Sequence, residues 1–137
     1  MTGVTDDRSQ IEEIVRTFFA AFSSGPDLEA RLEGLRAVLL PGALVVRTCG
    51  VPASYDVDGF IDPRRELLTS GRVDGFREWE LDGNTEVYGD LAHHWCTYAK
   101  EWVEDGEPVT GAGAKSIQLV RTEAGWRISA LAWDDER

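Results

Sequence analysis

The second half of the chain contains four long segments rich in β-branched and aromatic residues, separated by turn signals. These segments span residues 76–88, 91–104, 114–122 and 126–133. Asp105-Gly106 predicts a tight hairpin turn and Glu123-Ala124-Gly125 a second turn, whereas Asp82-Gly83, inside the first segment, predicts either a bulge or a turn. Strands joined by such short turns pair in antiparallel fashion, so the sequence predicts an antiparallel sheet.

The first half of the chain predicts helices with one apolar face each. Apolar residues recur at helical spacing over residues 11–22, and Ser9 and Glu12 form a capping-box pair in front of them. A second helix follows Asp27 and closes at Leu40-Pro41, and a third, over residues 59–68, follows Asp58 as its cap. Residues 43–49 between these helices predict a strand. This order predicts a single α+β domain over residues 1–137, with the helices packed on one face of the sheet.

The segment 91–104 is apolar on both of its faces. Leu91, His93 and Trp95 share one face, and His94 and Cys96 share the other, because successive side chains of a strand point to opposite sides. Helices can cover only one face of a sheet. The other face is therefore expected to meet a second copy of the chain, which predicts a homodimer through the outer face of the sheet.

Charge and motifs exclude several classes of function. The net charge is −11, which disfavours binding to nucleic acids and to anionic membranes. The first seven residues lack the pattern of a signal peptide and no apolar run is long enough to cross a bilayer, so a cytoplasmic location is expected. The stretch 111–116 is not a phosphate-binding loop, because Val109 and Ala114 stand where that loop needs glycine.

The two cysteines have no metal-binding spacing. Cys49 and Cys96 are far apart in the sequence and predict small buried apolar side chains rather than a disulfide or a zinc ribbon. His94 and Cys96 share a face and could begin a metal site, but the sequence shows no third ligand. The expectation is therefore a protein without a metal or another cofactor.

Four segments resemble the NTF2-like superfamily and, within it, the SnoaL-like proteins. They are FREWE at 76–80, YGDLAHHWCTY at 88–98, KSIQLV at 115–120 and GWRISALAWDDE at 125–136. The resemblance implies a cone in which three N-terminal helices pack on a strongly curved antiparallel sheet, with a pocket at its open end and a homodimer at its outer face. Members of the superfamily include ketosteroid isomerases, polyketide cyclases, dehydratases, epoxide hydrolases and non-enzymatic binding or assembly domains.

The resemblance also implies which residues line the pocket. The strand position that matches Tyr98 points into the cone, so alternation places His94 and Cys96 beside it and His93 outside. The expected pocket-lining residues are Arg47, Trp79, His94, Cys96, Tyr98, Trp102, Ile117 and Trp133.

The candidate chemistry is acid–base catalysis. His94 could transfer protons near neutral pH, Tyr98 could donate a hydrogen bond to a developing oxyanion, and Arg47 could hold a carboxylate or an enolate. A carboxylate base could come from Asp56, Asp62 or Glu78. Each of these residues also has a structural interpretation: His94 and Tyr98 as core residues, and Glu78 and Glu80 as part of a solvated or interface face.

Three functions remain open at this point. The first is binding of a small hydrophobic ligand in an apolar pocket. The second is a cofactor-free lyase or isomerase, or a polyketide-cyclase-like enzyme, acting on a small hydrophobic carbonyl compound. The third is a homodimeric assembly domain whose cone is filled by side chains. Ketosteroid isomerases use a tyrosine of the first helix as oxyanion donor, and Phe18, Phe19 and Phe22 on that helix cannot replace it.

Overall fold

The computed structural model describes residues 6–136, so the first five residues and Arg137, which the sequence analysis included, lie outside the described part. Its elements in chain order are α1 (Asp7–Ala20), α2 (Leu28–Val38), β1 (Leu39–Arg47), β2 (Ala53–Tyr55), α3 (Val57–Thr69), β3 (Val73–Tyr88), β4 (Leu91–Glu104), β5 (Glu107–Thr122) and β6 (Gly125–Asp135). Among these residues no helix combines the length and the apolar character that a bilayer crossing requires.

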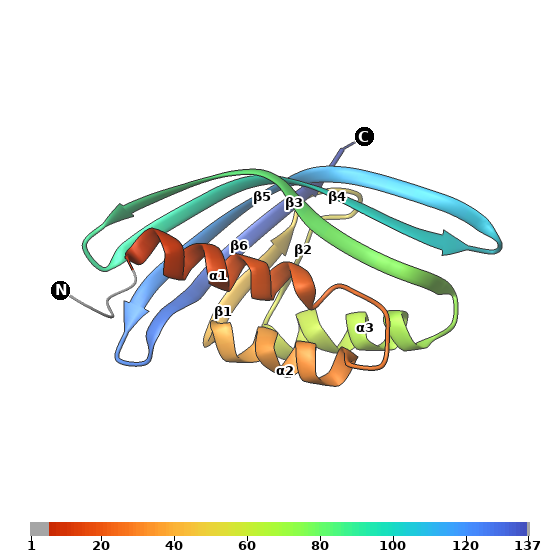
Figure 1. The fold of residues 1–137 in the computed structure, drawn as a ribbon, viewed down its shortest axis with the longest axis horizontal. Coiled ribbons are helices and arrows are strands. Elements are labelled where there is room, and N and C mark those ends of the chain that lie inside the picture. Colours follow the sequence, from red (N-terminus) through yellow and green to blue (C-terminus); the bar gives the residue numbers. More distant parts are fainter. Residues whose placement is uncertain (1–5, 137) are drawn as a thin grey trace.

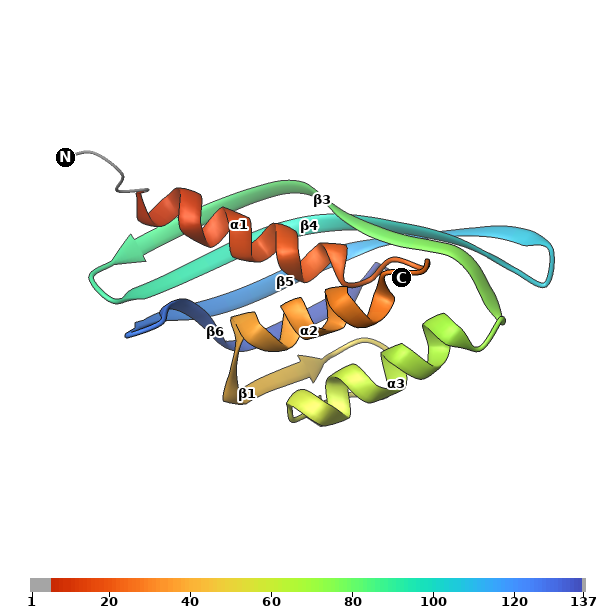
Figure 2. The ribbon, with the colours of Figure 1, turned by 60° about the horizontal axis from the view of Figure 1, so that its bottom comes forward.

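All six strands form one curved sheet, and the three helices lie on its concave side (Figure 1). The strand order is β2-β1-β6-β5-β4-β3. The long strands β3, β4 and β5 bend over α1, while α2 and α3 lie farther from them, on the same side of the sheet (Figure 2). The predicted α+β class, with helices on one face of a strongly curved sheet, is confirmed.

The sheet is mixed rather than wholly antiparallel. β1 pairs with β6 in parallel, with Val45 opposite Leu131, while β3 to β6 form antiparallel neighbours. β1 enters the sheet from α2 and not from a hairpin, so no tight turn fixes its direction. The turn signals of the second half of the chain carry no information about this strand.

Two predicted helix caps are wrong. The N-cap of α1 is Asp6, whose side chain accepts a hydrogen bond of 2.7 Å from the backbone N–H of Ser9. The N-cap of α3 is Asp56, which accepts a 2.7 Å hydrogen bond from the N–H of Gly59, while Asp58 pairs with an arginine of α2. In both helices the cap is an aspartate three residues before the amide to which it binds. Its carboxylate accepts the hydrogen bond from that free N–H group, in place of the residue predicted from the sequence.

Several predicted strand boundaries also differ, and the largest shifts are at the starts of β1 and β5. β1 begins at Leu39, so Leu39 and Leu40 belong to the strand and not to the end of the second helix. β5 begins at Glu107, seven residues before its predicted start at Ala114, because it pairs with β4 in an unbroken register as far as Glu104–Glu107. The turn between them is the predicted one: Asp105 and Gly106 both have positive φ, at 53° and 77°. Pairing across this hairpin overrides the weak strand propensity of glycine and proline.

A bulge interrupts β3 between Glu80 and Asp82. It leaves Leu81 outside the regular pairing with β4, close to the predicted Asp82-Gly83 position. One extra residue reverses the alternation of side chains. Before the bulge the even-numbered residues Glu78 and Glu80 point toward the helices, and after it the odd-numbered Thr85 does, as its contact with the buried His94 shows.

Candidate functional site

A cavity of about 330 Å³ lies between α3, the end of α1 and the sheet, within the range typical of small-molecule sites. Its walls are mainly apolar and aromatic. They are formed by Phe22, Phe60, Pro63, Arg64, Leu67, Leu68, Val73, Phe76, Glu78, Lys100, Trp102, Glu104, Lys115 and Trp133. The beginning of β3 curves toward the end of α3 (Figure 2), and Val73 and Phe76 of this part of β3 belong to the cavity wall.

Arg64 brings a positive charge to this apolar wall. Its guanidinium carbon lies 4.1 Å from the ring centroid of Phe60 and 5.1 Å from that of Trp133, and its Nη1 donates a 3.0 Å hydrogen bond to the backbone carbonyl of Phe60. Burial lowers the pKa of Arg64 to about 10. The guanidinium therefore stays charged near neutral pH, although it is held mainly by aromatic faces and a neutral carbonyl.

A buried ion pair forms the inner wall of the cavity. Lys115 Nζ lies 3.5 Å from Glu78 Oε2, and the two side chains are only 5% and 9% exposed. The ammonium also lies 4.1 Å from the ring centroid of Tyr98. Burial lowers the pKa of Lys115, and the charge of Glu78 opposes that effect. An amine whose charged form is disfavoured can give up its proton more readily than a surface lysine.

A second set of polar side chains beside the cavity links β4 to β6 across β5. The Tyr98 hydroxyl on β4 donates a hydrogen bond to Asp135 on β6, and Lys100 Nζ donates a 3.0 Å hydrogen bond to the other oxygen of the same carboxylate. Gly113 of β5 stands between them, and a Cβ at this position would come within 2.5 Å of the Tyr98 oxygen. The absence of a side chain at Gly113 is thus what allows Tyr98 to reach Asp135.

These contacts set the ionisation of both groups. Burial, together with the hydrogen bond to Asp135, raises the pKa of the Tyr98 hydroxyl, which therefore remains protonated and available as a donor. Burial raises the pKa of Asp135, but the hydrogen bonds from Tyr98 and Lys100 outweigh it and leave that pKa below its usual value.

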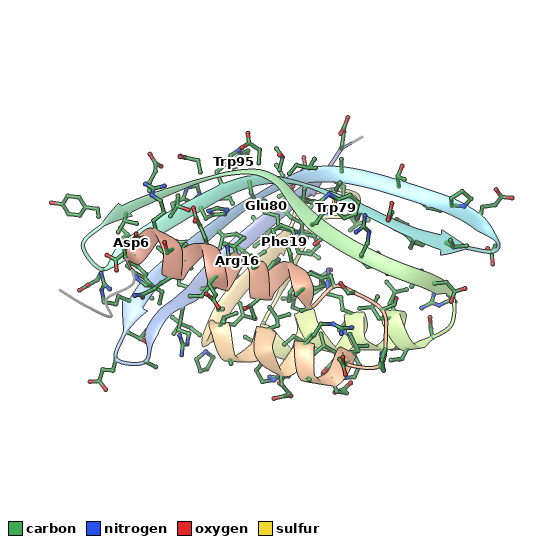
Figure 3. All side chains as sticks on the ribbon, viewed as in Figure 1. Asp6, Arg16, Phe19, Trp79, Glu80 and Trp95 are labelled. Carbon is green, nitrogen blue, oxygen red and sulfur yellow. The ribbon has the colours of Figure 1, made fainter. Side chains whose placement is uncertain are left out.

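The two histidines lie on opposite faces of β4, with His94 inside. His94 is 2% exposed; its Nε2 lies 2.5 Å from Glu80 Oε2 and its Nδ1 lies 2.7 Å from Thr85 Oγ1. His93 faces the other way and contacts Ser116 Oγ at 2.8 Å. Figure 3 shows Glu80 and Phe19 in the space between α1 and the sheet, and Trp95 on the opposite side. The predicted register of β4 is confirmed.

The architecture matches known structures across most of their length. An NTF2-like protein with a cystatin-like fold from Novosphingobium aromaticivorans is 21% identical, with 93% of this chain and 80% of that chain covered, at a TM-score of 0.71. The chain has the NTF2-like fold. An NTF2-like superfamily protein from Salmonella enterica is 15% identical, at 92% and 88% coverage and a TM-score of 0.70.

An enzyme is also among the structures similar to this chain. A hexachlorocyclohexane dehydrochlorinase from Novosphingobium barchaimii is 14% identical, with 95% of this chain and 86% of that chain covered, at a TM-score of 0.75. No protein-family model matches the sequence, and no curated protein matches it. The structural likeness therefore establishes the fold of the domain and leaves its activity to be argued from the site.

The structure distributes the predicted pocket residues of the NTF2-like domain over several places. Trp102 and Trp133 line the cavity. His94, Cys96, Tyr98 and Ile117 are buried on the same face of the sheet but do not form the cavity wall. The remaining two predicted residues, Arg47 and Trp79, lie elsewhere.

Arg47 donates hydrogen bonds to the carbonyl of Val51 at the edge of the sheet, and Trp79 lies against the Arg77 guanidinium at 4.2 Å. Among the candidate carboxylate bases, Asp56 caps α3 and Asp62 pairs with Arg65 on the surface, so only Glu78 reaches the cavity. The alternative interpretation as a solvated or interface face is wrong for Glu78, whose side chain is 9% exposed, whereas Glu80 stays about one-third exposed while it contacts the buried His94.

Arg64 and Lys115, two cations of the cavity wall, were not predicted as site residues. A signal for Lys115 was present: it shares its strand face with Ile117 and Leu119, both fully buried, so alternation alone places its ammonium inside. For Arg64 the signal was the spacing of four residues after the apolar Phe60 on the third helix, which places both on one helical face.

Proposed function

We propose that this domain binds a small, largely aromatic or aliphatic molecule that carries one anionic group. The observation that supports the proposal is the guanidinium of Arg64, which lies against the rings of Phe60 and Trp133 in a mainly apolar cavity wall. Lys100 and Lys115, the other two cations of the wall, are each paired with a carboxylate, Asp135 and Glu78. Arg64 stands outside these two pairs, and its planar fork suits a carboxylate or an enolate.

Replacing Arg64 with methionine should separate charged from neutral ligands. Met keeps an apolar side chain of similar length but cannot donate hydrogen bonds. The variant should bind 2-naphthylacetate about tenfold more weakly, because about tenfold is the smaller effect expected when a charge-assisted hydrogen bond is lost. Its affinity for 2-naphthylacetamide should change little. The tryptophan fluorescence of Trp102 and Trp133, which line the cavity, reports both titrations.

The matched control is Arg36→Met. It removes a guanidinium of α2 that pairs with Asp58 of α3 and does not line the cavity. This variant should bind both compounds as the unaltered protein does. Equal loss of the acid and the amide in Arg64→Met would indicate damage to the cavity and not removal of an anion partner. Absence of binding of any apolar acid by the unaltered protein would contradict the proposed function.

A second candidate function is acid–base catalysis on such a ligand. It is favoured by the Glu78–Lys115 pair in the cavity wall, where a carboxylate and an amine with a lowered pKa lie 3.5 Å apart. His94 does not line the cavity, so the base proposed here is Glu78 or Lys115 instead. Incubation of each bound compound in deuterated water, followed by mass spectrometry, tests whether the domain exchanges or eliminates a carbon-bound proton.

The outer face of the sheet is proposed to form a homodimer. Leu91 and Trp95 on the outer side of β4 are 48% and 51% exposed, and Tyr88 at the adjacent end of β3 is 88% exposed. Large apolar side chains gathered on one sheet face are typical of subunit interfaces. A cavity of about 330 Å³ beside the helices weighs against the third candidate, an assembly domain with a filled cone.

Trp95→Lys should convert the dimer to a monomer. A lysine there would place a charge in the interface, so the dissociation constant should rise at least about tenfold. Sedimentation velocity at micromolar concentration measures this change. Val51→Lys is the control, because Val51 is 78% exposed in a loop away from that face. A purely monomeric unaltered protein of 15.2 kDa would contradict the proposed interface.

A further inference from the structure

We propose that Glu80, His94 and Cys96 form a binding site for a divalent transition-metal cation of the zinc class. One ligand atom from each residue, a carboxylate oxygen, an imidazole nitrogen and a thiol sulfur, lies within 4.8 Å of the other two. The sequence offered only His94 and Cys96. The third ligand comes from the neighbouring strand, and one oxygen, one nitrogen and one sulfur ligand together suit Zn²⁺ better than Mg²⁺ or Ca²⁺.

The backbone brings these ligands together through two features. His94 and Cys96 are two residues apart on the inner face of β4, so their side chains point the same way. Glu80 and Thr85 both contact His94, so their side chains must point to the same face of β3. Regular alternation would put these two residues on opposite faces, and the bulge at Leu81 brings them to the same one. The bulge therefore assembles the ligands from a strand that would otherwise separate them.

Gly83 keeps the space beside the ligands free. It pairs with Cys96 across the sheet, and a Cβ at this position would come within 2.6 Å of Glu80 Oε2 and 2.8 Å of His94 Nε2. Such a distance is far below van der Waals contact, so any other residue would displace both ligand atoms. A glycine at this point leaves room where the Glu80 oxygen and the His94 nitrogen meet.

Thr85 orients the imidazole. Its hydroxyl, from a side chain that is 1% exposed, lies 2.7 Å from His94 Nδ1. With a cation bound, the hydroxyl would accept a hydrogen bond from Nδ1–H. The proton that joins Nε2 to Glu80 Oε2 at 2.5 Å would leave, and the Nε2 lone pair would bind the cation. An outer partner that holds the non-ligating nitrogen is the usual companion of a metal-bound histidine.

The site has an entry path and is balanced in charge. Glu80 is about one-third exposed and lines a groove between α1 and β3, together with Val15, Phe19 and Trp79. Of the three ligands only Glu80 lines this groove, so a cation entering there, past Arg16, would meet its carboxylate first. Cys96 is fully buried, and its thiol would release its proton when the cation binds. The resulting two negative charges, of the Glu80 carboxylate and the Cys96 thiolate, match one divalent cation.

The test is a titration of chelator-treated protein with Co²⁺, followed by displacement with Zn²⁺. We expect one Co²⁺ per chain, with the near-ultraviolet absorption that a cobalt–thiolate bond produces. Cys96→Ser and Glu80→Gln should weaken binding by more than about 100-fold, and Thr85→Val by about tenfold, since outer partners contribute 10- to 100-fold.

The controls are the other cysteine and the other histidine. Cys49→Ser and His93→Ala remove the same chemical groups outside the cluster and should leave the titration unchanged, because Cys49 lies elsewhere and His93 faces the outer side of the sheet. Binding that is equal in Cys96→Ser and in the unaltered protein would overturn the proposal, because the cation would then occupy an adventitious surface site.

X-ray absorption on the zinc-loaded, unaltered protein gives an answer that does not depend on any variant folding. One sulfur at about 2.3 Å together with nitrogen or oxygen ligands at about 2.0 Å is the expected first shell. A shell without sulfur, or no retained zinc after gel filtration, would overturn the proposal. Neither result affects the ligand-binding function, which is measured at the cavity beside α3.

Discussion

Replacing Lys115 with methionine is expected to lower the free energy of unfolding by about 3 to 5 kcal/mol, the usual cost of leaving one partner of a buried ion pair without the other. Methionine fills a similar volume, so the loss comes from the Glu78 carboxylate, which is 9% exposed and would keep no ammonium partner. Urea unfolding followed by circular dichroism measures the change.

A double variant separates the charge effect from packing. Glu78→Gln added to Lys115→Met removes the unpaired carboxylate, so the double variant should be more stable than Lys115→Met alone. Lys100→Met is the matched single control: Lys100 is 19% exposed and pairs with a carboxylate that is about one-third exposed, so its loss should cost about 1 kcal/mol or less. If Lys115→Met costs no more than Lys100→Met, the inner wall of the cavity does not depend on the pair.

Tyr98→Phe should destabilise the protein by about 1.5 to 3 kcal/mol near neutral pH, the range for a hydrogen bond to a charged group. The ring and its packing stay, and only the hydroxyl that donates to Asp135 is lost. Because about a third of the Asp135 side chain is exposed, water can replace part of the bond, and we expect a value near the lower limit. Tyr55→Phe is a suitable control, because Tyr55 stacks on Trp133 through its ring.

The effect of Tyr98→Phe should also depend on pH in one direction. The folded-state pKa of Asp135 lies below the ordinary value of 3.8, so its contacts contribute stability that is fully present above that value. This contribution disappears as the pH falls through the folded-state pKa and the carboxylate takes up a proton. Urea unfolding at a series of acidic pH values should show the difference between the two proteins shrinking below about pH 4. A difference that stayed constant would mean that Tyr98 acts through packing.

Much of the sheet could be predicted from the sequence because the residues that indicate strands and turns lie within the strands and turns themselves. The bounds of β4 follow from its turn residues at both ends, and its alternation put His94, Cys96 and Tyr98 on one face. That this face is the helix side was implied by the family resemblance, and the burial of all three residues agrees with it.

The helices were also predicted from local residues, since one apolar face repeats over three or more turns. Asp27 was correctly predicted at the start of α2, but the caps of α1 and α3 were not. Two acidic or hydroxyl side chains near each of those starts could serve, and only backbone geometry selects between them.

The site was predicted less well because it depends on contacts between segments distant in sequence. Glu80 meets His94 only because of a one-residue bulge, and a sequence pattern that continues at period two gives the opposite face. Arg64 reaches Trp133 from a helix, and the distance between these elements follows from the curvature of the sheet. Neither the contact between Glu80 and His94 nor the distance between Arg64 and Trp133 is encoded in a short stretch of residues.

Because Gly113 lets Tyr98 reach across β5, the last strand is tied to β4 as well as to its direct neighbours. Strands at the end of a chain usually open locally at little cost in free energy, and their amide protons then exchange quickly with water. Here the Glu136 N–H, which donates a 2.7 Å hydrogen bond to Ala112 O, lies next to a residue held by Tyr98 and Lys100. Local opening at this end of β6 must therefore break contacts of a fully buried tyrosine, so the slowly exchanging part of the molecule should extend to its last described strand.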